Sequence, residues 1–107
     1  MQLNPDLIRD ILLKAELGSF EILKNNDNDV NFFKLLKDKN TLKQFEEEKE
    51  KYQKPEEFIS YSNREIEYHT LFLKEAELIV IEKNSITVTL EISDLTVAGH
   101  NFVSNIR

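Results

Sequence analysis

The apolar residues at the start of the chain recur every three or four positions, which is the spacing of one face of an α-helix. They are Leu7, Ile8, Ile11, Leu12 and Ala15. Asn4 is a favourable N-cap residue, Pro5 suits the first helical position, and Gly18 can adopt the left-handed conformation that ends a helix. The pattern predicts a core-packing helix from about Pro5 to Leu17, and we see no chemistry on it.

The stretch that follows shows no sustained period. Phe20–Leu23 is a short apolar run that fits either a strand or the fraying end of the first helix. The polar run Asn25–Asp29 predicts a loop, because it lacks the glycine and the bidentate glutamate that a Ca²⁺-binding loop requires. Residues 56–61 fit either a one-turn helix or a short strand.

Residues 30–39 and 41–52 both have helical patterns. Asn40 can act as an N-cap that divides them, but the apolar spacing also fits one continuous helix with a narrow apolar seam. The charged run Glu46–Lys51 is typical of a solvated helix face. The alternative is an acidic arm that docks on a basic partner.

A further helix signal begins at Ser62. Ser62 and Glu65 have the spacing of a capping box, in which each side chain bonds the backbone N–H of the other residue. The stripe that follows consists of Ile66, Thr70, Leu73 and Ala76. Together these features predict a helix from Asn63 to about Glu77.

The next segment has the pattern of a β-hairpin. Leu78–Ile81 is wholly apolar and predicts a buried strand. Residues 86–92 alternate between apolar and polar side chains, as a half-buried strand does. The predicted tight turn between the two strands consists of Lys83, Asn84 and Ser85.

The last helix is predicted to begin near Thr96, which is a plausible N-cap. Its apolar side consists of Phe102, Val103 and Ile106. Gly99 lies too early to end this helix and instead predicts the close approach of another backbone segment.

A helix followed by a hairpin is the order of a recognition helix and its wing. The predicted fold class is therefore α+β, a mainly helical winged helix-turn-helix with a C-terminal β-hairpin wing and a closing helix. We predict one domain over residues 1–107, with an inserted or rebuilt helical segment at about 19–54.

Several stretches carry a resemblance, namely residues 3–13, 61–69, 73–79, 95–102 and 105–107. They include the pieces Ile-x-Tyr-His, which ends at His69, and Leu-Thr-x-x-Gly-His, which ends at His100. In these pieces the chain resembles an uncharacterised family of short winged-helix proteins from Gram-positive bacteria and their prophages. The family usually has glycine where this chain has Glu77, and residues 19–54 do not look like its shorter connection. The resemblance implies a winged-helix fold and a mobile-element origin, but no activity.

Composition narrows the class of protein. The 107 residues include no cysteine, which excludes a disulfide framework, a thiolate zinc site and a cysteine nucleophile, and favours a reducing, cytoplasmic location. No run approaches the ~20 apolar residues of a membrane span, so we expect no membrane association. The net charge of −6 lowers the expectation of DNA binding and leaves open a partner that is itself basic.

Candidate contacts to DNA or to a protein partner lie on the 63–77 helix and at the predicted hairpin tip. They are Asn63, Arg64, Glu67, Tyr68, Leu71, Lys74, Lys83 and Asn84. The helix carries two basic and four acidic residues, which is a poor match to a wall of phosphates. Leu71 and Phe72 are expected to pack beneath the inserted segment. The alternative is an exposed apolar patch, which would mark a partner or a dimer contact.

We predict no enzyme activity, cofactor or metal. His69 and His100 lack a third ligand at a suitable spacing and are expected to be structural. Two hypotheses for function stay open. The first is a DNA-binding regulator of a prophage or mobile element. The alternative is an acidic adaptor or inhibitor that binds a host protein and uses the winged helix as a scaffold, as a monomer or a homodimer.

Overall fold

The computed structural model of the protein describes residues 1–24, 28–82 and 88–106. Along these residues the chain forms, in order, α1 (Pro5–Leu17), β1 (Phe20–Leu23), α2 (Asn28–Leu35), α3 (Lys39–Lys51), a 3₁₀ turn η1 (Glu56–Phe58), α4 (Asn63–Glu75), β2 (Ile79–Glu82), β3 (Thr89–Leu95) and α5 (Val97–Ile106). The predicted α+β class is confirmed. Of the ambiguous segments, residues 20–23 form a strand and residues 56–58 a one-turn helix.

Helix α1 has the predicted bounds. The Asn4 side chain accepts the backbone N–H groups of Asp6 and Leu7, at 3.0 and 3.4 Å, so two of the free donors at the helix start are satisfied. Gly18 ends the helix with φ of 155° and ψ of 176°. This is not the left-handed helical conformation that we expected, but it too lies where a side chain is rarely tolerated.

The three strands form one antiparallel sheet in the order β1-β3-β2. On its inner face Phe20 pairs with Ile92, which also lies opposite Ile81 of β2. The strand predicted over 86–92 runs on to Leu95, and its first two residues, with the predicted turn 83–85, lie outside the described residues. β2 is less buried than predicted, because it is an edge strand: Ile79 is buried, whereas Val80 is 41% exposed.

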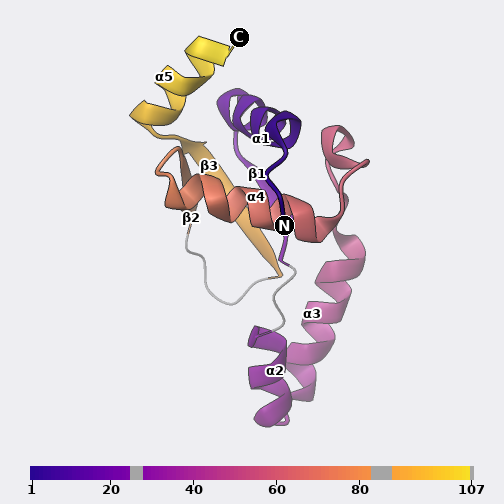
Figure 1. The fold of residues 1–107 in the computed structure, drawn as a ribbon. Coiled ribbons are helices and arrows are strands. Elements are labelled where there is room, and N and C mark those ends of the chain that lie inside the picture. The colour runs from indigo at the N-terminus through magenta and orange to yellow at the C-terminus, as the bar shows by residue number, and fades with distance from the viewer. Residues whose placement is uncertain (25–27, 83–87, 107) are drawn as a thin grey trace.

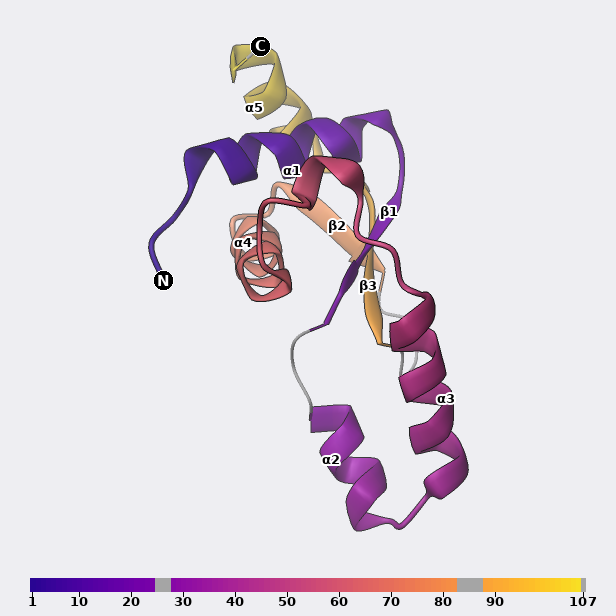
Figure 2. The same ribbon diagram turned by 90° about the vertical axis from the view of Figure 1, so that its right-hand side faces the viewer.

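Helices α1 and α4 pack against each other and against the sheet, and α5 packs beside α1 (Figures 1 and 2). The core between them is formed by Leu7, Ile11, Leu12, Ala15, Ile22, Phe58, Ile66, Leu73, Ile79, Ile92, Leu95 and Val103. The short η1 contributes through Phe58, which is fully buried and has its ring 5.8 Å from that of Phe20. The core therefore includes residues from both the first and the last helix of the chain.

Helices α2 and α3, residues 28–51, form an arm that projects away from the sheet (Figures 1 and 2). They pack chiefly on each other, and the arm makes the molecule long, with extents of 49 × 26 × 25 Å. The two separate helices are confirmed, and the continuous helix is wrong. The break lies at Lys37, whose φ is 57°.

Asp38 caps α3, not Asn40 as we expected. Its carboxylate accepts the Thr41 N–H at 3.1 Å and the Thr41 hydroxyl at 2.8 Å. These bonds lower the pKa of Asp38, because they favour the charged form. Of the predicted loop Asn25–Asp29, residues 25–27 lie outside the described residues, and the prediction is wrong for the last two, because α2 begins at Asn28.

The end of α4 is set by Glu77, which adopts a left-handed conformation with φ of 60°. The Glu77 N–H bonds the Lys74 carbonyl and the Leu78 N–H bonds the Leu73 carbonyl, which is the Schellman arrangement usually closed by glycine. The helix ends at Glu75, slightly before the predicted Glu77. The chain passes directly from this stop into β2.

Thr96 caps α5 as predicted, because its hydroxyl oxygen accepts the Gly99 N–H at 3.0 Å. The close packing predicted at Gly99 is also confirmed. A Cβ there would overlap the carbonyl oxygen of Leu78 and lie 3.2 Å from the Cβ of Leu95. The same Leu78 oxygen accepts the Thr96 N–H at 3.0 Å. Helix α5 is therefore seated on the start of β2.

Candidate interaction surface of helix α4

Helix α4 is positioned by its first turn and its inner face. The Ser62 hydroxyl accepts the Glu65 N–H at 3.1 Å, and the Glu65 carboxylate accepts the Ser62 N–H at 3.3 Å, so the predicted capping box is confirmed. The buried residues of the helix are Ile66, His69, Thr70 and Leu73. The Thr70 hydroxyl donates to the Ile66 carbonyl at 2.7 Å, so it needs no partner outside the helix.

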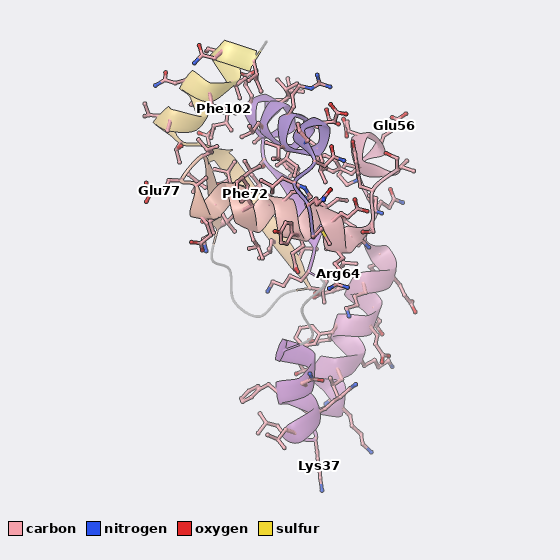
Figure 3. The ribbon with its side chains drawn as sticks, viewed as in Figure 1. Lys37, Glu56, Arg64, Phe72, Glu77 and Phe102 are labelled. Carbon is pink, nitrogen blue, oxygen red and sulfur yellow. The ribbon has the colours of Figure 1, made fainter. Side chains whose placement is uncertain are left out.

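The outer face of α4 carries three large, partly exposed side chains, Tyr68, Leu71 and Phe72, which we call the α4 stripe. They are 41%, 41% and 40% exposed. Their spacing of three and one residues places them on one side of the helix. The expectation that Leu71 and Phe72 pack beneath the inserted segment is wrong, because α2 and α3 extend away from this face (Figure 3). These two side chains instead form part of an exposed apolar patch, which was the alternative interpretation.

The charged candidates of α4 are scattered. Arg64 is exposed in the first turn (Figure 3), whereas Glu67 and Lys74 are half-buried. The amide oxygen of Asn63 is buried and has no hydrogen-bond partner among the described residues. Lys83 and Asn84 lie outside the described residues. The basic groups described on α4 therefore do not form a continuous row.

His69 ties the start of the chain to α4. Its Nε2 accepts the Asn4 N–H at 2.8 Å, and its Nδ1 lies 2.7 Å from the Glu65 carbonyl oxygen, to which it donates. Both ring nitrogens are thus used in a residue that is 1% exposed, which gives His69 a structural role. The residue that precedes Asn4, Leu3, is therefore held beside α4.

His100 has a different environment. It is exposed on α5, and its Nε2 lies 3.8 Å from the Asp94 carboxylate. Among residues 1–24, 28–82 and 88–106, no three histidine or carboxylate side chains come together in a way that could hold a metal ion. The structure thus places the two histidines on different elements, with separate partners.

An apolar groove of about 550 Å³ lies between the start of α1 and α5. Its lining consists of Leu3, Pro5, Asp6, Ile8, Arg9, Phe102 and Ile106. The sequence pattern assigned Phe102 to the buried side of α5, but this side chain is 41% exposed and lines the groove, while Val103 is fully buried. The groove could not be predicted from the sequence. Helical spacing identifies the apolar face of α5, but it does not show how much of that face α1 covers.

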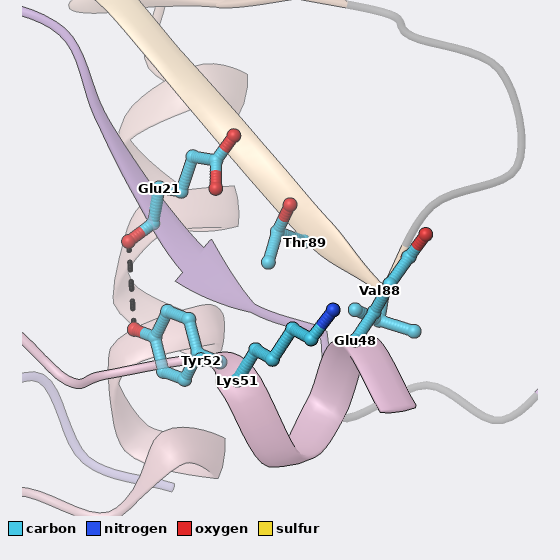
Figure 4. Close-up of a pocket in the computed structure, with 6 residues that line it drawn as sticks. All are labelled: Glu21, Glu48, Lys51, Tyr52, Val88 and Thr89. Carbon is cyan, nitrogen blue, oxygen red and sulfur yellow. Dashed lines mark hydrogen bonds between the residues drawn. The ribbon is translucent and has the colours of Figure 1, made fainter. Parts of the chain in front are cut away.

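A second hollow, of about 340 Å³, lies where α3 meets the ends of β1 and β3 (Figure 4). It is lined by Glu21, Glu48, Lys51, Tyr52, Val88 and Thr89. The Tyr52 hydroxyl donates to the Glu21 carbonyl at 3.4 Å, and burial raises the pKa of this hydroxyl. Sequence reasoning gave no sign of this hollow, because its walls come from three separated segments.

Acidic side chains stand in a row across the outer face of the sheet beside this second hollow. Glu91 of β3 lies directly opposite Glu21 of β1 on one side and Glu82 of β2 on the other. Like charges at opposed sheet positions repel each other. The row lowers the stability of the sheet, and a cationic group placed over it would relieve the repulsion.

Comparison with known proteins gives a family but no activity. No curated protein and no solved structure matches the chain. None of the described helices is both long and apolar enough to cross a membrane. A family of hypothetical proteins designated DUF2513, a domain of unknown function, matches residues 2–107, including the 19–54 segment that the resemblance in the sequence did not cover. The chain therefore belongs to the DUF2513 family.

Proposed function

We propose that the protein is a protein-binding module that presents α4 on a winged-helix scaffold. Support for the scaffold comes from the order of the elements: α4 is followed by the antiparallel pair β2–β3, and β1 adds to the other edge of β3. This is the order of a recognition helix and a wing. Fold alone does not determine function, so the proposal depends on what the surface of α4 carries.

The observation that carries the proposal is the α4 stripe. Three large apolar or aromatic side chains, each about two-fifths exposed, occupy the position where a DNA-reading helix places polar groups. Aromatic side chains at the centre of an interface supply much of the binding energy between proteins. In contrast, a surface that binds DNA needs several phosphate contacts, and α4 offers Arg64 and Lys74.

The charge of the protein indicates the chemistry of the partner. The net charge of −6 favours a basic surface, and the stripe requires an apolar groove within that surface. A host protein with such a groove also fits the prophage or mobile-element origin that the sequence resemblance implies. We therefore infer an adaptor or inhibitor, in which the stripe supplies affinity and the acidic surface supplies steering.

One pair of variants tests this role. Leu71→Asp and Phe72→Asp should each abolish capture of the partner from a lysate of the source organism, because a buried charge at an apolar interface is costly. Val97→Asp is the matched control, because Val97 is 79% exposed on a different helix. If the same partner is captured equally by Phe72→Asp and by the unchanged protein, the proposal is wrong.

A second candidate, DNA binding, rests on Arg64, which is exposed in the first turn of α4. Contacts to base edges usually come from this turn of a recognition helix. Titration against random-sequence duplex at low and at high salt separates the two candidates. Binding that is lost in high salt and in Arg64→Ala, but kept in Phe72→Asp, would favour DNA over a protein partner.

A further inference from the structure

The tip of the arm is apolar and basic. Leu35 and Leu36 are 81% and 58% exposed there, at the end of α2 and in the turn that follows. Four lysines surround them and are opposed by one acidic residue: between positions 34 and 43 the charged residues are Lys34, Lys37, Asp38, Lys39 and Lys43. The tip therefore combines aliphatic side chains with positive charge.

The arm has little support from the rest of the protein. Helix α2 has eight residues and α3 has thirteen, and they pack chiefly on each other. Isolated helices shorter than ~12–15 residues are marginal in water, and most helix stability comes from tertiary packing. A surface that covers the arm would therefore stabilise it.

The base of the arm has the opposite character. Residues 46–50 contain four glutamates and one lysine. Beside them lies the 340 Å³ hollow, which includes the carboxylates of Glu21 and Glu48 and one lysine, Lys51. The row formed by Glu21, Glu91 and Glu82 continues the acidic surface across the sheet. The base therefore offers a cavity with acidic walls.

We propose that two copies of the chain pair through their arms in antiparallel orientation, so that the tip of each arm docks on the base of the other. In this arrangement the exposed leucines of one copy enter the hollow of its partner, and the tip lysines face the partner's glutamates. The hollow of about 340 Å³ has room for a side chain, and its walls include Tyr52 and Val88, against which an aliphatic side chain can pack.

Two-fold symmetry makes the geometry consistent. In a two-fold dimer, if the tip of one copy reaches the base of the other, the reverse contact follows automatically. A parallel pairing would instead place lysines against lysines and glutamates against glutamates. Charge therefore selects the antiparallel orientation.

The size of the contact indicates a weak dimer. Thirteen residues of α-helix are about 20 Å long, and two helices side by side are roughly 20 Å wide, so the arm face covers on the order of 400 Å² per copy. Stable interfaces bury about 800 Å² per partner. We therefore expect association at high protein concentration that weakens as salt is added.

Charge reversal at either end of the arm tests the pairing. The tip variant Lys37→Glu with Lys39→Glu, and the base variant Glu48→Lys with Glu91→Lys, should each weaken the dimer by about tenfold or more in sedimentation analysis. The base variant should fold at least as well as the unchanged chain, because a lysine at position 91 would stand between two glutamates. Thermal unfolding provides the control for both.

Mixing the two variants gives the decisive result. The two variants leave opposite ends unchanged, because the base variant keeps the basic tip and the tip variant keeps the acidic base. A mixed dimer therefore retains one unchanged tip-to-base contact, so an equimolar mixture should associate more tightly than either variant alone. Leu35→Ser should also remove the dimer while leaving the fold intact. A chain that stays monomeric at all concentrations, or a mixture that fails to associate, would overturn the proposal. So would a dimer that Phe72→Asp abolishes and the tip variant does not.

The dimer is independent of the proposed role of α4. If the tip variant still captures the α4 partner, the arm pairing and the partner binding are separate properties of the surface. Loss of partner capture in Phe72→Asp, with the dimer kept, would support both inferences. Failure of the mixed-dimer experiment would leave the role of α4 standing.

Discussion

Replacing Gly99 by alanine should destabilise the protein, although the same change normally stabilises a helix. In a helix interior alanine is about 1 kcal/mol more favourable than glycine. At position 99, however, the added Cβ would overlap the carbonyl oxygen of Leu78 and lie 3.2 Å from the Cβ of Leu95. Neither atom is the end of a flexible side chain: the first belongs to the backbone, and Leu95 is 4% exposed.

The size of the destabilisation depends on how little the atoms around the new Cβ can move. The Leu78 oxygen accepts the Thr96 N–H at 3.0 Å, and Thr96 in turn caps α5, so separating the two backbones would break the junction that orients the helix. Overpacking of this kind costs about 1–3 kcal/mol, and here the cost opposes the propensity gain. We expect a net loss of about 1 kcal/mol, or roughly 5 °C in melting temperature for a domain of this size.

Urea unfolding followed by far-UV circular dichroism measures this loss. Ser104→Ala is the matched control, because Ser104 is exposed on the same helix and alanine there should add a few tenths of a kcal/mol. The two changes to alanine should therefore have opposite signs. If Gly99→Ala unfolds at the same or a higher urea concentration than the unchanged protein, the close approach of α5 to β2 is refuted.

Three further predictions concern caps and junctions. Glu77→Gly should stabilise the protein by about 1 kcal/mol, because glycine adopts positive φ without steric cost; a loss in urea unfolding would contradict the left-handed helix stop. His69→Phe should cost about 1–3 kcal/mol in the same assay, because the Asn4 N–H loses its acceptor; an unchanged midpoint would contradict the link. The third concerns acid. Hydrogen bonds from Thr41 lower the pKa of Asp38 in the folded state below its ordinary value of 3.8. The stabilising effect of Asp38 is therefore present above pH 3.8 and is lost as the pH falls through the lower folded-state pKa. The difference in free energy of unfolding between the unchanged protein and Asp38→Ala should therefore become smaller in acid. If the difference does not change with pH, the negative charge of Asp38 does not contribute to stability.

Local signals allowed the elements to be predicted, and non-local packing limited the rest. Asn4, Ser62 and Thr96 were recognisable as caps, because capping depends on residues within one turn. The exposure of Leu71 and Phe72 was not predictable, because it depends on where the arm goes, and helical spacing contains no information on that. The N-cap of α3 at Asp38 was not predicted for a different reason. It depends on the left-handed backbone conformation of Lys37, which is uncommon for lysine and which no sequence pattern indicates.

The larger features of the candidate surfaces arise from pairing between distant segments. The acidic row exists because Glu21, Glu82 and Glu91 meet in register, and neither the register nor the sheet order can be read from alternation alone. The two hollows are similar cases. Their lining residues are ordinary in sequence and form a site only where separate segments meet: three segments at the hollow beside α3, and two at the groove between α1 and α5.

The pairing of β1 with β3 determines which part of the chain can tolerate insertions and deletions. This pairing joins Phe20 to Ile92, so the arm, η1, α4 and β2 all lie within one closed loop of the chain. The entropy cost of closing a flexible loop rises only with the logarithm of its length, by about 0.6 kcal/mol for each doubling. Insertions or deletions in the arm should thus leave the sheet and the core almost unaffected. The arm is a segment whose length can vary freely while the α4 surface is held constant.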